Sequence, residues 1–138
     1  LFVAGFIGTP TMNFFNAHYS GDGRLHGDGF TVMAPRWLRE RRPATGQELT
    51  MGVRPQTLRM ADGMPGGEPA AFTIQVDVVE YLGTESQVVG HLAIPGGQRV
   101  SAIVPGDGHA LLHTRLGLTV DPETLHVFDS ASGRSLRP

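Results

Sequence analysis

The sequence predicts an all-β domain, a small barrel or sandwich of short strands with one or two short helical turns. The chain of 138 residues contains 19 glycines and 10 prolines, and such a content favours tight turns over long helices. Several segments alternate apolar and polar residues with the period of two that a half-buried strand requires. No long helical segments alternate with these strands, which argues against a parallel α/β fold.

The first 35 residues divide into an apolar segment and a region of short strands. Residues 1–16 are apolar with Gly and Pro breaks, and we interpret them as a connecting segment or hinge. In residues 17–35, glycine-rich turns at residues 20–23 and 27–29 separate short strand-like pieces. We therefore expect the domain itself to begin at residue 17.

The middle of the chain alternates polar stretches with one strand. Residues 36–48 are polar and basic, and Gly46 predicts a turn. Residues 49–54 form a predicted strand that Pro55 closes, because proline has no N–H to donate to a sheet. Residues 62–69 are the clearest loop in the sequence.

The C-terminal half contains the most regular strand patterns. Residues 72–78 alternate in the strand period, Val79 breaks the pattern, and residues 80–83 predict a bulge or bend. Further strands are expected at residues 86–94, 99–104, 115–120 and 125–128. Residues 121–124 predict one helical turn, with Asp121 as its N-cap and Pro122 at its first position.

The composition excludes several classes of chemistry. Cysteine is absent, so disulfides and thiolate metal sites are excluded. All eleven basic residues are arginine, so no P-loop lysine or Schiff-base lysine can exist in this chain. The net charge of −2 argues against general nucleic-acid binding. The apolar start has no basic flank and is too short to span a bilayer, so a signal peptide is not expected, and the chain reads as a fragment of a longer protein.

Four stretches of the sequence carry a family resemblance: VAGFIGTPTMNFF (residues 3–15), GVRPQTL (52–58), VVEYLGTESQV (78–88) and LHVFDSASGRSL (125–136). Their order and spacing resemble the C-terminal region of ABC importer ATPases of the MalK/UgpC type. The resemblance implies that residues 17–138 form an OB-like barrel, called a TOBE domain, and that residues 72–138 are its most TOBE-like part. It also implies that residues 1–16 link this barrel to a nucleotide-binding domain.

The resemblance implies a regulatory and dimerisation domain that acts by protein contact and not by catalysis, with no cofactor of its own. The full-length bacterial protein would bind ATP and Mg, and would lie peripherally on the cytoplasmic face of the plasma membrane. It would pair as a homodimer or with another ATPase subunit and dock on permease subunits. The imported solutes would be sugars or compounds like glycerol 3-phosphate. A cytoplasmic regulatory protein stays open as a further partner.

The residues expected to make these contacts fall into two groups. The hinge and dimer-contact group is Gly5, Phe6, Gly8, Pro10, Asn13 and Phe14. The regulatory contact group is Arg54, Pro55, Glu80, Gly83, Phe128 and Asp129. Arg54 would offer a guanidinium at a strand end to a partner's carboxylate or carbonyl, or would simply be a solvated strand end. Gly83 would take a positive φ angle. Where the family commonly has Glu after the Arg-Pro pair, this chain has Gln56.

Two other functions remain as alternatives to this interpretation. The first is a regulatory barrel that binds an anionic metabolite such as a sugar phosphate, for which the arginines are suited. The second is a barrel that binds single-stranded nucleic acid through the basic residues 36–42 and Trp37. The negative net charge and Glu40 count against the second alternative.

Catalytic and metal sites are not predicted. His109 and His113 have the i, i+4 spacing of a helical metal pair, but no Glu follows His109 as the zinc motif requires. Glu80 and Glu85 could act as a carboxylate pair only in a sugar cleft, and no feature of the sequence indicates one. We therefore expect no catalytic residue, no metal ligand and no cofactor-binding residue in this chain.

Overall fold

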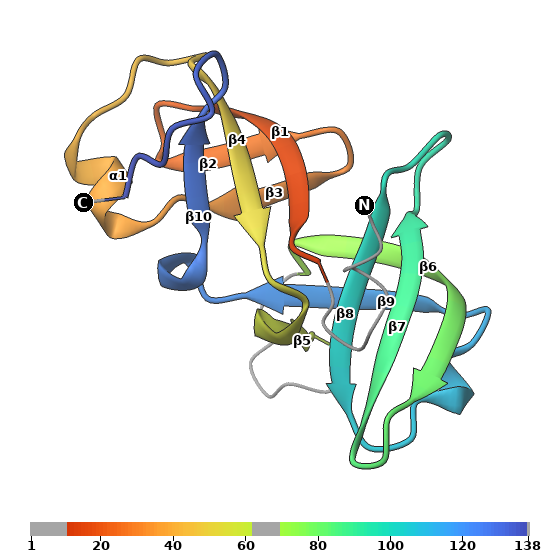
Figure 1. The fold of residues 1–138 in the computed structure, drawn as a ribbon. Coiled ribbons are helices and arrows are strands. Elements are labelled where there is room, and N and C mark those ends of the chain that lie inside the picture. Colours follow the sequence, from red (N-terminus) through yellow and green to blue (C-terminus); the bar gives the residue numbers. More distant parts are fainter. Residues whose placement is uncertain (1–10, 62–69, 138) are drawn as a thin grey trace.

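A computed structural model describes residues 11–61 and 70–137, which form ten strands and one short α-helix (Figure 1). The strands of the N-terminal half are β1 (Asn13–Tyr19), β2 (Arg24–Gly27), β3 (Phe30–Met33), β4 (Glu48–Val53) and β5 (Leu58–Met60). Those of the C-terminal half are β6 (Phe72–Tyr81), β7 (Glu85–Leu92), β8 (Arg99–Pro105), β9 (Arg115–Val120) and β10 (His126–Asp129). The helical segments are α1 (Arg36–Glu40) and the 3-10 turns η2 (Pro55–Thr57), η3 (His109–Leu111) and η4 (Pro122–Thr124). The all-β prediction is confirmed.

The strands gather into two lobes of one antiparallel sheet (Figure 1). In the first lobe the order of neighbours is β10-β4-β1-β2-β3, and α1 lies beside it. In the second lobe β6 pairs with both β7 and β9, β7 pairs with β8, and β9 pairs with β5. The chain builds the first lobe with β1 to β4, passes through the second, and returns to place β10 beside β4.

Three phenylalanine rings pack together where the two lobes meet. Phe30 of β3 pairs with Phe72 of β6, which is the only register contact between these strands. The ring of Phe15 lies 5.0 Å from that of Phe30 and 5.1 Å from that of Phe72, and the Phe30 and Phe72 rings are 5.2 Å apart, each distance measured between centroids. Phe15 and Phe72 are each 1% exposed. Because the rings belong to one continuous core, the lobes share apolar burial and should unfold together.

Strand β1 begins at Asn13, four residues before the domain boundary expected from the sequence. Its side chains alternate strictly, with Phe15 and Ala17 buried and Phe14 and Asn16 exposed. Two adjacent phenylalanines hide this alternation in the sequence, because both are apolar although they face opposite sides of the sheet. The last residues of the segment interpreted as a connector or hinge therefore form the beginning of β1 in the first lobe.

The basic stretch and the region after Pro55 differ from the expected pattern. Residues 36–40 form the single helical turn α1, whose Leu38 is 2% exposed in the core. Strand β4 ends at Val53, just before Pro55 as expected, but the short strand β5, which pairs with β9, follows the turn η2 and was not predicted. The irregularity in β6 lies between Val76 and Val78, ahead of the position expected from the sequence. The predicted loop at residues 62–69 lies outside the described residues.

Several local predictions are confirmed. The φ angle of Gly83 is +110° and that of Gly46 is +86°, in the left-handed region that glycine enters without a steric cost. Strand β9 covers the expected residues 115–120. The side chain of Asp121 accepts a hydrogen bond from the Glu123 N–H at 3.0 Å, as an N-cap does, and Pro122 occupies the first position of η4.

Candidate functional site

An aromatic patch lies on the outer face of β1, β4 and β10, and we call it the aromatic face: Met12, Phe14, Gly52 and Phe128. The Phe14 and Phe128 rings stand 6.0 Å apart between centroids, and the Phe14 side chain is 51% exposed. Gly52 lies opposite Phe14 in β4, so the patch has no side chain at its centre. A Cβ atom at Gly52 would overlap Met12 and approach Phe128 to 3.3 Å. The missing side chain therefore lets the neighbouring rings and the thioether cover the strand.

One end of the aromatic face is positively charged. His126 lies opposite Gly52 in β10, and Arg54 follows β4 directly. The pKa of His126 lies below its usual value, first because the imidazole is partly buried and then because Arg54 and Arg137 repel its charged form. Within the described residues, no carboxylate pairs with either arginine. We call Arg54 and Arg137 the cationic end, and His126 lies beside them.

Asn13 is buried and links the two lobes. Its amide nitrogen donates to the carbonyl oxygens of Val53 at 3.0 Å and of Ser101 at 2.9 Å. Its side-chain oxygen accepts a hydrogen bond from the Ser101 N–H at 2.8 Å. Asn13 was predicted to contact a partner subunit, but its polar atoms are engaged within the chain.

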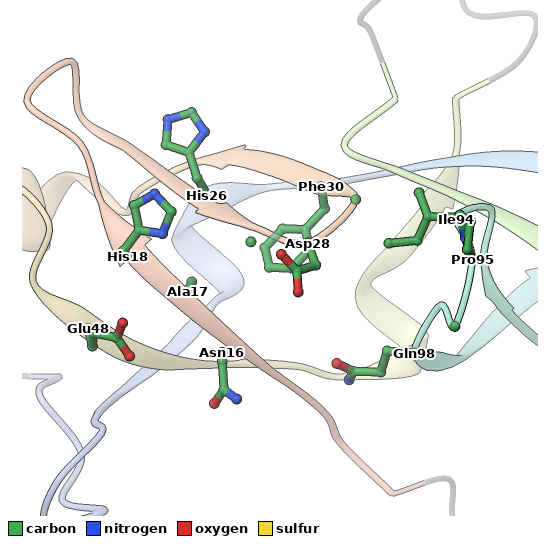
Figure 2. A pocket seen from close by; sticks show the side chains of 13 residues that line it. Asn16, Ala17, His18, His26, Asp28, Phe30, Glu48, Ile94, Pro95 and Gln98 are labelled. Carbon is green, nitrogen blue, oxygen red and sulfur yellow. The ribbon is translucent and has the colours of Figure 1, made fainter.

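A polar cleft of about 700 Å³ opens between the lobes (Figure 2), and we call it the inter-lobe cleft. The first lobe contributes Asn16, His18, His26, Asp28 and Glu48 to its lining, and the second lobe contributes Ile94, Pro95 and Gln98. The His18 and His26 rings stack with their centroids 5.6 Å apart. Their strand positions face each other across β1 and β2. None of these residues was predicted as a site residue.

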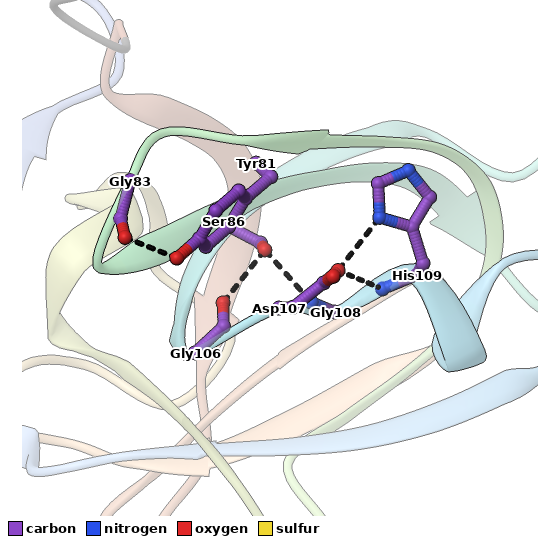
Figure 3. Close-up of polar contacts among 7 residues, drawn as sticks. All are labelled: Tyr81, Gly83, Ser86, Gly106, Asp107, Gly108 and His109. Atoms are coloured by element: carbon purple, nitrogen blue, oxygen red, sulfur yellow. Dashed lines mark hydrogen bonds and ion pairs between the residues drawn. The ribbon is translucent and has the colours of Figure 1, made fainter.

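A polar cluster holds the end of β8 in place (Figure 3). The buried Ser86 hydroxyl donates to the Gly106 carbonyl and accepts from the Gly108 N–H, both at 2.8 Å. Asp107 accepts hydrogen bonds from the ring and the backbone N–H of His109 at 2.6 and 3.0 Å, which lower the pKa of Asp107. His109 thus takes part in a turn. Among the described residues, no group of three or more potential metal ligands is clustered.

The predicted contact residues do not share one surface. Phe14 and Phe128 meet on the aromatic face, with Arg54 at its cationic end. Glu80 and Gly83 lie in the β6–β7 hairpin of the second lobe, at the opposite side of the view from β10 (Figure 1).

Three further predicted sites have local settings. Pro55 is buried as the first residue of η2. Asp129 accepts a hydrogen bond from the Ser132 N–H at 2.9 Å, and the hydrogen bonds from Ser132 lower the pKa of its carboxyl. The remaining predicted hinge residues lie outside the described residues: Gly5, Phe6, Gly8 and Pro10.

The basic stretch and Gln56 also have defined surroundings. The guanidinium carbon of Arg41 lies 5.1 Å from the centre of the Trp37 ring, a cation–π contact, and Trp37 packs against the core. Gln56 lines a groove of about 540 Å³ between β5 and β8, together with apolar residues such as Leu58 and Ile103. Within residues 11–61 and 70–137, no helix is long and apolar enough to cross a membrane.

Two family models match the chain. The model described as the MalK OB fold domain matches residues 8–58, and the TOBE domain model matches residues 51–128, which is more than half of the chain. A solved structure of the cytoplasmic molybdate-binding protein ModG superposes with a TM-score of 0.66, covering 83% of this chain and 94% of that one. Its sequence identity is 17%, so this likeness shows the fold alone.

The curated relatives are ATP-binding proteins of importers. The sn-glycerol-3-phosphate import ATP-binding protein UgpC of Cereibacter sphaeroides is 36% identical over 98% of this chain and 35% of its own length. The sulfoquinovosyl glycerol transport ATP-binding protein SmoE of Agrobacterium fabrum is 32% identical over 99% of this chain and 36% of its own. The xylose/arabinose import ATP-binding protein XacK of Haloferax volcanii is 32% identical over 99% of this chain and 35% of its own length. The chain thus spans about a third of the length of these relatives.

Proposed function

The chain belongs to the TOBE domain family, and from this premise we propose that it is the regulatory and dimerisation domain of an ABC importer's ATP-binding subunit. The predicted resemblance to the MalK/UgpC type is confirmed by the two family matches and by relatives that align along nearly the whole chain. The domain acts by contact with a second copy of the subunit, and it has no chemistry of its own.

The aromatic face is the observation that carries this proposal. Phe14 and Phe128 are held in fixed positions on a rigid sheet, and Phe14 leaves half of its side-chain surface open to solvent. Aromatic rings placed in this way bury much apolar area at little cost in conformational entropy. The interior of the domain already has its own continuous core, so these rings are available to another subunit.

The charges along β4 support a two-fold arrangement of the pair. Glu48 begins the strand and Arg54 follows its end, and both positions share the alternation of the outer face. Two copies that pair face to face with β4 antiparallel place Arg54 of each near Glu48 of the other. A two-fold interface requires such self-complementarity, and rim charges of this kind set the register of the pair more than its affinity.

The size of the face favours a weak pair. A stable interface buries about 800 Å² on each partner, and two aromatic rings with a methionine supply only part of that area. We propose that the nucleotide-binding domains of the full-length subunit add the remaining contacts. The domain then holds two subunits near each other while those domains open and close.

The activity of the whole protein extends the proposal beyond this chain. The full-length subunit binds ATP and Mg through its nucleotide-binding domain and docks on permease subunits at the cytoplasmic face of the membrane. Its solutes are sugars or glycerol-phosphate-like compounds. The names of the relatives support this assignment.

The absence of an ATPase site in this chain has a direct test. The purified 138-residue chain is incubated with ATP and Mg, and phosphate release is followed as the ATP concentration rises. We expect no saturable hydrolysis, because the sequence has no lysine for a P-loop. Saturable hydrolysis that follows the chain through purification would contradict the proposal.

The cationic end favours a second candidate function, the binding of an anionic metabolite. Arg54 and Arg137 have no carboxylate partner among the described residues. The partly buried imidazole of His126 lies near both of them. Calorimetry with glycerol 3-phosphate tests this candidate. Heat that disappears in the Arg54→Gln variant would support a small-molecule regulator, and no heat is expected if the cationic end serves only protein contact.

A further inference from the structure

The inter-lobe cleft is built by two parts of the chain that are distant in sequence. The β2–β3 turn approaches the β7–β8 connection, and Gly29 allows this contact because a Cβ atom there would lie 2.9 Å from the Ile94 side chain. The amide of Gln98, the residue before β8, donates to the backbone carbonyl of Phe14 in β1. These two contacts connect the walls of the cleft to each other.

Polar side chains of three kinds line the cleft on its first-lobe side. Asn16 offers a carboxamide, Asp28 and Glu48 offer carboxylates, and His18 offers an imidazole (Figure 2). No hydrogen bond joins the side chains of Asn16, Asp28 or Glu48 to any other described residue. His26, in contrast, is engaged at both ring nitrogens, with Thr31 at 3.1 Å and Ser20 at 3.0 Å. His26 thus fixes the stack while the other groups stay available to a ligand.

The charge of the lining selects against anions. Two carboxylates line the cleft, and neither an arginine nor a lysine is among its lining residues. A phosphate or carboxylate ligand would meet Asp28 and Glu48 without a fixed cation to offset them, and like charges in close contact cost free energy. The chemistry of this cleft therefore differs from that of the cationic end.

The opposite wall is aliphatic. Ile94 is 37% exposed and stands next to Pro95 on the β7–β8 connection, facing the polar side across the cleft (Figure 2). Carboxylates accept hydrogen bonds from hydroxyl groups, a carboxamide both accepts and donates them, and an aliphatic wall packs against C–H groups. A compound with hydroxyl groups along one edge and C–H groups on its face matches both walls.

We propose that the inter-lobe cleft binds a neutral polyhydroxylated small molecule, a sugar or polyol. Asp28, Glu48 and Asn16 bind its hydroxyl groups, and Ile94 and Pro95 pack on its carbon skeleton. The site is open to solvent, so a weak dissociation constant on the order of 1 mM is expected. Because both lobes contribute to the cleft, the ligand also ties them together. Asn16 and Glu48 lie on the same outer face of β1 and β4 as Phe14, so the proposed pairing of subunits would compete with the ligand, and the inference is made for the unpaired chain.

Nuclear magnetic resonance titration of the ¹⁵N-labelled chain with glucose tests this inference, and glucose 6-phosphate serves as the charged comparison. We expect saturable shifts of the backbone amides of Asn16, Asp28 and Gln98 with glucose, and a weaker response to the phosphate ester. Maltose and glycerol extend the neutral series. The inference is overturned by the absence of saturable shifts with all three neutral compounds, or by tighter binding of the phosphate ester.

Matched variants separate binding from folding and from pairing. Asp28→Asn should weaken glucose binding roughly tenfold. Glu40→Gln should leave it unchanged, because Glu40 is an exposed residue of α1, outside the cleft, that pairs with Arg36. The dispersion of the spectrum shows whether each variant is folded, and Asn16→Ala serves as the second cleft variant. Binding should persist in Phe14→Ser, which disrupts only the aromatic face. Unchanged affinity in both cleft variants would contradict the assignment.

Discussion

The side chain of Asn13 pairs with both backbone groups of Ser101, accepting from its N–H at 2.8 Å and donating to its carbonyl at 2.9 Å. Strand β8 ends the order of paired strands, so among residues 11–61 and 70–137 no strand pairs with Ser101 on that side. One carboxamide takes the place of a strand residue and joins the edge of the second lobe to the first strand of the first lobe. This contact explains why an asparagine is buried at 8% exposure.

Removing this carboxamide should destabilise the domain. We expect Asn13→Ala to lower the free energy of unfolding by about 1–3 kcal/mol, because the Ser101 N–H and two carbonyl oxygens lose their partners. Urea denaturation followed by circular dichroism measures the change. The control is Asn16→Ala, on the exposed face of the same strand, which should stay within about 0.5 kcal/mol of the native chain. Equal stabilities of the two variants would contradict the role of Asn13.

The phenylalanine cluster at the lobe junction should carry much of the stability. Phe72→Ala is expected to cost about 3–5 kcal/mol, because Phe72 is 1% exposed and contacts the rings of Phe15 and Phe30. Phe14→Ala, which removes a ring that is 51% exposed, should cost far less. Denaturation curves of both variants give the comparison. A small effect at Phe72 would show that the lobes do not share one core.

The pH dependence of stability should contain a contribution from His126. Its pKa is lower in the folded chain than the usual value of about 6.5, so the unfolded chain takes up the proton first as the pH falls. Stability is therefore retained above about pH 6.5 and declines as the pH drops below it towards the folded pKa. The variant His126→Gln should show a smaller decline when melting temperatures at pH 7 and pH 5 are compared. An identical decline in both proteins would argue against this assignment.

Gly90 should not tolerate a side chain. It lies in β7, where a Cβ atom would overlap the carbonyl oxygen of Gln75 in the adjacent strand β6. Gly90→Ala should therefore lower the free energy of unfolding by about 1–3 kcal/mol, because the backbone must shift. Gly21→Ala is the control, since its Cβ would meet only the Thr45 hydroxyl at 3.4 Å. Thermal denaturation of the two variants tests whether the strands approach so closely.

Local features of the fold could be predicted from short sequence patterns. Strand β9, the capped turn at Asp121 and the positive φ angle of Gly83 each depend on a few neighbouring residues whose chemistry is specific. Strand β5 could not be predicted, because it is only three residues long and directly follows the Pro55 turn. The family resemblance supplied the overall assignment that these patterns alone do not give.

The candidate sites depended on contacts between distant parts of the chain. Asn13 and Ser101 are 88 residues apart in sequence, and no local pattern shows that they meet. The inter-lobe cleft likewise combines the β2–β3 turn with the β7–β8 connection. Phe14 and Phe128 were predicted separately as contact residues, but only the fold places their rings together. Gly52 did offer a signal, because glycine inside a strand often marks a close approach.

Self-association of the purified chain is the most direct test of a domain that acts through subunit contact. Sedimentation equilibrium over a range of concentrations should show a reversible equilibrium between monomer and dimer, and the double variant Phe14→Ser/Phe128→Ser should shift it to monomer. The control Leu82→Ser changes a residue that is 43% exposed in the β6–β7 hairpin of the second lobe and should dimerise like the native chain. At a concentration of about 1 mM, sedimentation detects a dimer whose free energy of association is only about −4 kcal/mol. A native chain that stays monomeric at this concentration would contradict the proposed function. A dimer that the double variant leaves unchanged would instead exclude the aromatic face.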